Sequence, residues 1–70
     1  MDTVETTRLS QELKRQGRDA GWLGRKIGYS YMHTWMVSTG RTPASDRFWA
    51  LAAEALGVEV GSIRDEERVA

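Results

Sequence analysis

The chain has 70 residues, and its ten basic side chains are balanced by ten acidic ones, giving a formal net charge of zero at pH 7. It contains no cysteine, which excludes disulfide bridges and thiolate metal sites. No apolar run approaches the length that spans a bilayer, and the N-terminus lacks the basic-then-apolar order of a signal peptide. We therefore expect one small, soluble domain, built from helices because local contacts suit so short a chain.

The charges are unevenly distributed along the chain. Residues 1–47 hold eight basic and five acidic side chains, a net charge of +3, whereas residues 48–70 hold two basic and five acidic ones, a net charge of −3. A candidate anion-binding surface is therefore expected on the first part of the chain, with an acidic end that balances it.

The first helix is predicted over residues 8–16, after a polar segment of residues 1–6 that we expect to fray. Two leucines four residues apart lie on one face of this helix, and basic residues fall in its last turn. Thr6 or Thr7 can cap the helix at its start, and Gly17 is placed to end it.

The second helix is predicted over residues 20–27, with Asp19 as its N-cap. Gly21 and Gly24 fall within it, and each glycine costs about 1 kcal/mol of helix stability relative to alanine. We interpret both as positions of close packing against a neighbouring element, in preference to close approach of a ligand.

A tight turn and a third helix follow. Gly28 tolerates a positive φ where the chain must reverse, and Ser30 can cap a helix over residues 31–39. Thr34 and Val37 lie one turn apart, so they can face the same core as the apolar residues of the second helix.

The fourth helix is predicted over residues 46–56, where a wide apolar stripe begins after a cap by Ser45 or Thr42 and ends at Gly57. Residues 58–63 alternate in a way that fits a strand or a short helix, and we take the helix. Residues 64–70 form a charged tail.

The segment Leu23 to Val37 resembles the helix-turn-helix of the Cro and lambda-repressor family. Gly24 stands where that family has a very small residue, Gly28 at its turn glycine and Tyr29 at the apolar position after it, while Thr34 replaces the usual Val or Ile. The sequence Gly40-Arg41-Thr42-Pro43 is similar to the loop that leaves the second helix of the motif. The resemblance covers residues 7–63 and implies an all-α, compact bundle of five short helices.

The resemblance also implies a function, that of a phage or bacterial transcriptional regulator that binds double-stranded DNA in the cytoplasm. The third helix would enter the major groove and use its first turns to contact base edges. The family's base-facing positions fall on Ser30, Tyr31, Met32, Trp35 and Met36. Contacts with phosphates are predicted for Arg18, Arg25, Lys26, Thr39, Arg41 and Arg47, together with the amides at the start of the second helix.

An alternative is a protein-interaction module that uses the same fold. The chain is rich in large apolar residues, and the predicted groove-facing side lacks the Arg, Asn or Gln that usually contacts bases. Its apolar face, made of Tyr31, Met32, Trp35 and Met36, could meet a second subunit or another protein. The sequence leaves open a monomer or a homodimer formed on DNA.

No catalytic, cofactor or metal site is predicted. The chain has no glycine-rich phosphate loop and no cluster of acidic residues paired with histidine at metal-ligand spacing. His33, its single histidine, is interpreted as a partly exposed helix residue on the DNA side, and the acidic run Asp65-Glu66-Glu67 as a solvated end of the chain. We therefore do not expect an enzyme.

Overall fold

The computed structural model describes residues 7–64, and every regular element in this part of the chain is an α-helix. The helices are α1 Arg8–Arg15, α2 Ala20–Ile27, α3 Tyr31–Ser38, α4 Asp46–Leu56 and α5 Val60–Ile63. The predicted all-α bundle of five short helices is thereby confirmed. The fraying predicted for residues 1–6 and the acidic run of residues 65–67 lie outside the described residues.

The helices begin at the capping residues that the sequence predicts. In α1 to α4 the side chain of the N-cap accepts a hydrogen bond from the backbone N–H three residues later. The caps are Thr7, Asp19, Ser30 and Ser45, with donor–acceptor distances of 2.9 to 3.2 Å. Thr7 and Ser45 thus resolve the two choices that the sequence left open.

The helices end within one or two residues of the predicted positions. Gly28 and Gly57 follow α2 and α4 with left-handed φ angles of 84° and 73°. The third helix ends at Ser38, one residue earlier than predicted, and Thr39 forms its C-cap. The last helix begins only at Val60, because residues 57–59 are still needed to turn the chain after α4.

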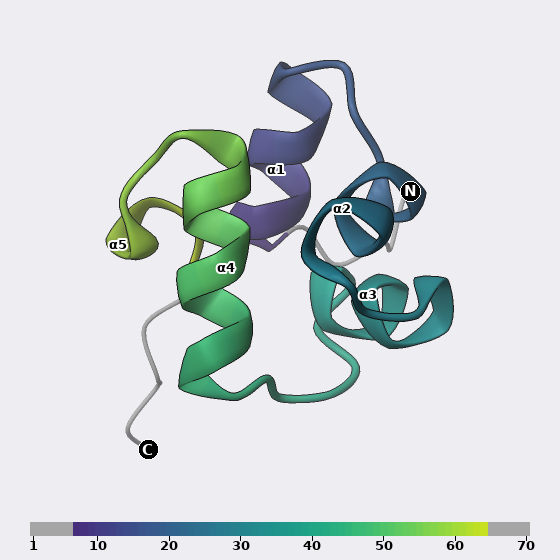
Figure 1. The fold of residues 1–70 in the computed structure, drawn as a ribbon. Helices are drawn as coiled ribbons and strands as arrows, with labels where there is room; N and C mark the ends of the chain where they lie inside the picture. Colours follow the sequence, from purple (N-terminus) through teal and green to yellow (C-terminus); the bar gives the residue numbers. More distant parts are fainter. Residues whose placement is uncertain (1–6, 65–70) are drawn as a thin grey trace.

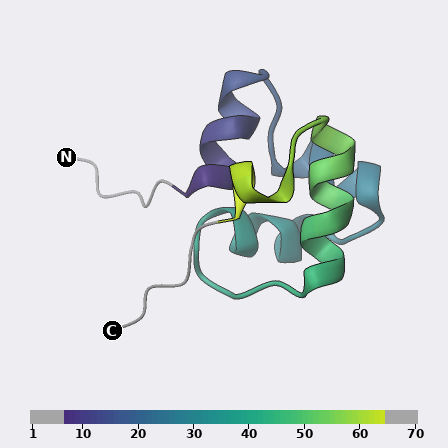
Figure 2. The same cartoon turned by 90° about the vertical axis from the view of Figure 1, so that its left-hand side faces the viewer.

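The helices form two neighbouring groups around one core. Helices α2 and α3 lie together on the right in Figure 1, joined by the Gly28 turn, and α2 also packs against α4. Helix α5 lies between α1 and α4 (Figure 2) and contacts both. The buried core draws on all five helices and consists of Leu9, Leu13, Leu23, Val37, Phe48, Ala52, Ala53, Leu56 and Ile63.

Candidate nucleic-acid interface

The corner between α2 and α3 depends on Gly24. A methyl group added at this residue would lie 2.9 Å from the carbonyl oxygen of Tyr29 and 3.0 Å from Oγ1 of Thr34. Such distances are too short for carbon next to oxygen, so only glycine allows α3 to start this close to α2. The prediction of close packing is confirmed for Gly24.

Gly21 does not share this constraint. A methyl group there would make contacts of 3.5 to 3.6 Å with Arg25, Asp19 and Tyr31, which are ordinary van der Waals distances. The prediction that packing requires glycine at this position is therefore wrong. The nearest atoms all belong to side chains and lie at ordinary contact distances, so there is room for one more carbon.

The inward side of α3 consists of Thr34, Val37 and Ser38, which are all buried. Thr34 is fully buried, and its hydroxyl donates a hydrogen bond of 2.9 Å to the carbonyl oxygen of Ser30. Threonine is therefore acceptable at this fully buried position, because its hydroxyl is satisfied by the backbone of the helix start.

The outward side of α3 carries four of the five residues predicted to face bases, and the fifth, Ser30, is the N-cap of the helix. Ser30 is exposed, and Tyr31 and Met32 each keep 58% of their accessible surface. Trp35 and Met36 follow one turn later and are half-buried. Tyr31, Met32, Trp35 and Met36 thus share one side of the helix, with its first turn the most accessible part, whereas Ser30 lies one turn before the buried Thr34.

Two predicted phosphate-binding residues flank this side. The guanidinium of Arg25 and the ring of Tyr31 both come within 3.6 Å of the position that a methyl group at Gly21 would take. At the other end of α3, the guanidinium carbon of Arg41 lies 5.0 Å from the centroid of the Trp35 ring, a cation–π contact. Positive charge therefore stands beside both ends of the exposed side.

Arg18 and Lys26 both lie close to the ring of Trp22. The guanidinium carbon of Arg18 is 4.0 Å from the centroid of the indole ring, and Nζ of Lys26 is 5.9 Å from it. Lys26 also borders an open depression of about 340 Å³ with Ile27, Leu51, Glu54 and Ala55. These two cations thus form a second basic region, on the side of α2 that faces α4.

The two remaining predicted phosphate contacts differ in character. Arg47 is exposed in the first turn of α4, next to Asp46, which pairs with Arg64 at 3.1 Å. Thr39 is half-buried, and its hydroxyl donates to the carbonyl oxygen of Trp35 at 2.9 Å. Thr39 can therefore offer a phosphate no further proton, whereas Arg47 keeps all its donors in solvent.

The start of α2 is less favourable for a phosphate than the sequence suggests. The carboxylate of Asp19 accepts the N–H of Trp22 at 2.9 Å, so an anionic group already occupies one of the amides predicted to hold phosphate. Contacts of these amides with DNA would bring two negative charges together. The arginines beside the corner are the better candidates.

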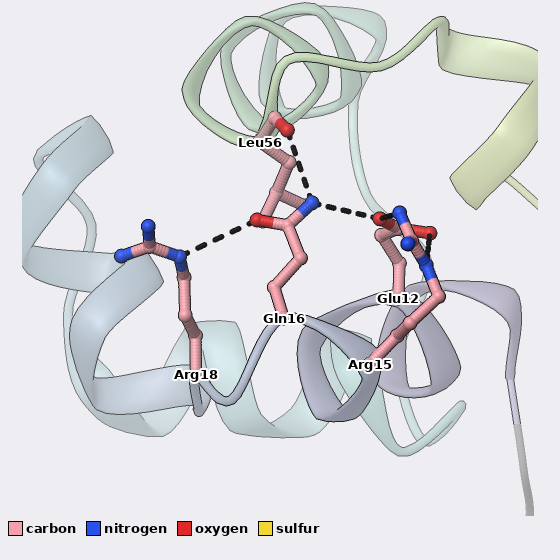
Figure 3. A network of polar contacts seen from close by, with 5 residues as sticks. All are labelled: Glu12, Arg15, Gln16, Arg18 and Leu56. Carbon is pink, nitrogen blue, oxygen red and sulfur yellow. Dashed lines mark hydrogen bonds and ion pairs between the residues drawn. The ribbon is translucent and has the colours of Figure 1, made fainter.

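A polar network that the sequence did not reveal fixes Arg18 (Figure 3). Its Nε donates to Oε1 of Gln16 at 3.3 Å, and Nε2 of Gln16 donates to the carbonyl oxygen of Leu56 at 3.1 Å and to Glu12 at 2.7 Å. Glu12 is also paired with Arg15. The network joins the end of α1 to the end of α4 and aligns Arg18 over Trp22.

The same network perturbs the ionisation of its two charged members. The hydrogen bond from Arg15, and then that from Gln16, lower the pKa of the Glu12 carboxyl below its ordinary value of 4.5. The hydrogen bond to Glu12 raises the pKa of Arg15 in return. Both groups therefore remain ionised across the neutral range.

Nothing in residues 7–64 suggests a metal centre, since no three His, Asp or Glu side chains there are grouped closely enough to hold an ion. None of the helices in this range has the length and apolar character needed to cross a membrane. The imidazole of His33 is half-buried and stacks on Tyr29, with ring centroids 5.4 Å apart, and it also meets the edge of Phe48.

Comparison with known proteins gives no match: no protein-family model, no curated protein and no solved structure matches this chain. The functional argument therefore depends on the geometry of the α2–α3 corner and on the chemistry of the residues that it exposes.

Proposed function

We propose that this chain is a sequence-specific DNA-binding transcriptional regulator of the Cro or lambda-repressor type, phage or bacterial, acting in the bacterial cytoplasm. The observation that carries the proposal is the α2–Gly28–α3 corner, which exposes the first turn of α3 beside Arg25. A helix presented in this way fits the major groove of B-DNA, which is about 12 Å wide.

In this proposal the two sides of α3 have separate tasks. The buried side, centred on Thr34 and Val37, fixes the direction of the helix, and the exposed Tyr31 and Met32 contact base edges. Arg25 at one end and Arg41 at the other neutralise phosphates on either side of the groove. The chain acts by occupying its operator.

Zero net charge does not argue against this assignment. The five cations that the sequence predicts to contact phosphates, among them Arg25 and Arg41, all lie within the basic part of the chain. Affinity for DNA depends on the local potential at the contact surface more than on the total charge of the molecule.

A mobility-shift assay with random-sequence duplex DNA at low salt tests the proposal, and retardation is the expected result. Arg25→Ala should weaken binding to all sequences alike, whereas Tyr31→Ala should change the sequences recovered in a selection from random DNA. Both side chains are exposed, so both variants should fold as the wild type does. Failure of the wild-type chain to retard any duplex would contradict the proposal.

One observation favours a second candidate, a protein-interaction module. Tyr31 and Met32 are the two large apolar residues that residues 7–64 leave exposed, and they are adjacent. Exposed apolar residues of this kind often mark a surface that binds another protein. Two results together would favour this function over DNA binding. The chain would not retard duplex DNA at low salt, and Met32→Ala would lower a measured affinity for a protein partner.

A further inference from the structure

Residues 29–40, which include all of α3 and its caps, contain no Arg, Lys, Asn, Gln, Asp or Glu. These are the residues that form bidentate hydrogen bonds with guanine and adenine or accept a hydrogen bond from cytosine in the major groove. The element placed to enter the groove therefore lacks the side chains that distinguish three of the four bases.

The smaller polar groups of the same segment are largely engaged within the helix. The hydroxyls of Thr34, Ser38 and Thr39 all donate to backbone carbonyl oxygens one turn earlier, at 2.9 to 3.0 Å. The hydroxyl of Ser30 accepts the N–H of His33 at 3.1 Å, and the His33 ring packs against Tyr29 and Phe48. Few hydrogen-bonding groups remain for a base edge.

Apart from the hydroxyl of Tyr31, what α3 exposes is apolar. Tyr31 and Met32 on the first turn each keep 58% of their accessible surface, and Met36 and Trp35 continue the same side one turn later. The one apolar group that a base pair presents in the major groove is the C5-methyl group of thymine. The apolar part of this surface is therefore complementary only to thymine, and the hydroxyl of Tyr31 is left as a hydrogen-bonding group that every base can meet.

We propose, on the basis of the DNA-binding function proposed above, that α3 recognises thymine methyl groups and that Met32 is its principal contact. The preferred DNA carries thymine-rich half-sites, and sequence selection depends on burial of methyl groups where a typical helix-turn-helix uses hydrogen bonds. Arg25 and Arg41 supply affinity without base preference.

The test compares one pool of duplexes in two forms, containing either thymine or deoxyuridine, which lacks only the C5-methyl group. The wild-type chain should bind the thymine form more tightly, by about fourfold for each methyl group buried. A second comparison uses a selected site in which the thymines are replaced by cytosines. Substituting 5-methylcytosine for these cytosines restores the C5-methyl groups and should strengthen binding relative to unmodified cytosine.

Two variants separate the recognition of methyl groups from the contacts with phosphates. Met32→Ala should reduce the ratio of the two affinities toward one, and its exposed position should leave the helical circular-dichroism spectrum unchanged. Arg25→Ala, the matched control, should weaken binding to both forms equally and keep the ratio.

The outcomes distinguish this inference from the function on which it depends. Equal, salt-dependent binding to the thymine and deoxyuridine forms would overturn methyl recognition and leave DNA binding intact. Absence of binding to either form at low salt would overturn both.

Discussion

At the scale of single residues, two glycines one turn apart in α2 have opposite roles. Gly24 lies against the backbone of residues 29 and 30, which are held in place by the turn and by the cap of α3. Gly21 faces only side-chain atoms at ordinary contact distances. The same substitution at the two sites should therefore have effects of opposite sign.

Gly24→Ala should destabilise the fold by about 1 to 3 kcal/mol, because the added methyl group forces α3 away from α2. Gly21→Ala should be neutral or stabilise it by up to about 1 kcal/mol, since alanine favours the helix and meets no clash. Urea denaturation followed by circular dichroism measures both changes. A Gly24→Ala variant as stable as Gly21→Ala would contradict the close helix crossing.

At the scale of elements, α3 is held at both ends by other parts of the chain. Its start is pressed against α2 at Gly24, and its last carbonyl, that of Ser38, accepts a hydrogen bond of 2.7 Å from the hydroxyl of Thr7. The same Thr7 oxygen caps α1 by accepting the N–H of Ser10. One side chain thus fixes α1 and the end of the proposed recognition helix.

Thr7→Val should therefore cost about 1 to 3 kcal/mol of stability, because it removes a helix cap and a partly buried hydrogen bond together. Thr7→Ser keeps the hydroxyl and should retain most of the stability, which makes it the matched control. Thermal unfolding compares the three proteins. If Thr7→Val and Thr7→Ser lowered the midpoint of thermal unfolding equally, the hydroxyl of Thr7 would have no role in joining the two helices.

The network between α1 and α4 predicts a specific pH dependence. Because the pKa of Glu12 is lower in the folded state than its ordinary value of 4.5, ionised Glu12 stabilises the fold above that pH, and this contribution is lost as the pH falls through the lower folded pKa. Glu12→Gln should flatten the loss of stability below about pH 4.5. Arg15→Gln should flatten it in part, since Gln16 still donates to Glu12.

Denaturant titrations at several acidic pH values check this prediction. An acid-dependent loss of stability in Glu12→Gln as steep as in the wild-type chain would show that other carboxyl groups control the acid response.

At the scale of the whole molecule, the features that the sequence predicted correctly are those that depend on residues close together in the chain. The capping residues Asp19, Ser30 and Ser45 and the turn glycine Gly28 act within three or four residues, so their pattern alone placed the corner between α2 and α3. For the same reason Phe48, Ala52 and Leu56 of α4 were predicted to be apolar core positions, whereas Leu51 and Ala55 of the predicted stripe are only half-buried and the buried Ala53 was not predicted.

The contacts that the sequence did not predict join residues far apart along the chain. The bond from Thr7 to Ser38 spans 31 residues and that from Gln16 to Leu56 spans 40. The orientation of Arg18 over Trp22 and the packing of His33 on Phe48 likewise depend on the tertiary arrangement. Local spacing could not show that Gly21 is free of close contacts, because the nearest atoms include those of α3.

The affinity for duplex DNA as a function of salt tests the central claim, that the arginines beside α3 neutralise phosphates, most directly. For the two contacts by Arg25 and Arg41, the logarithm of the binding constant should fall against the logarithm of the salt concentration with a slope of about −2, and Arg25→Ala should reduce the size of that slope by about 0.9. A binding constant that does not fall as salt rises from about 50 to 200 mM would contradict the account.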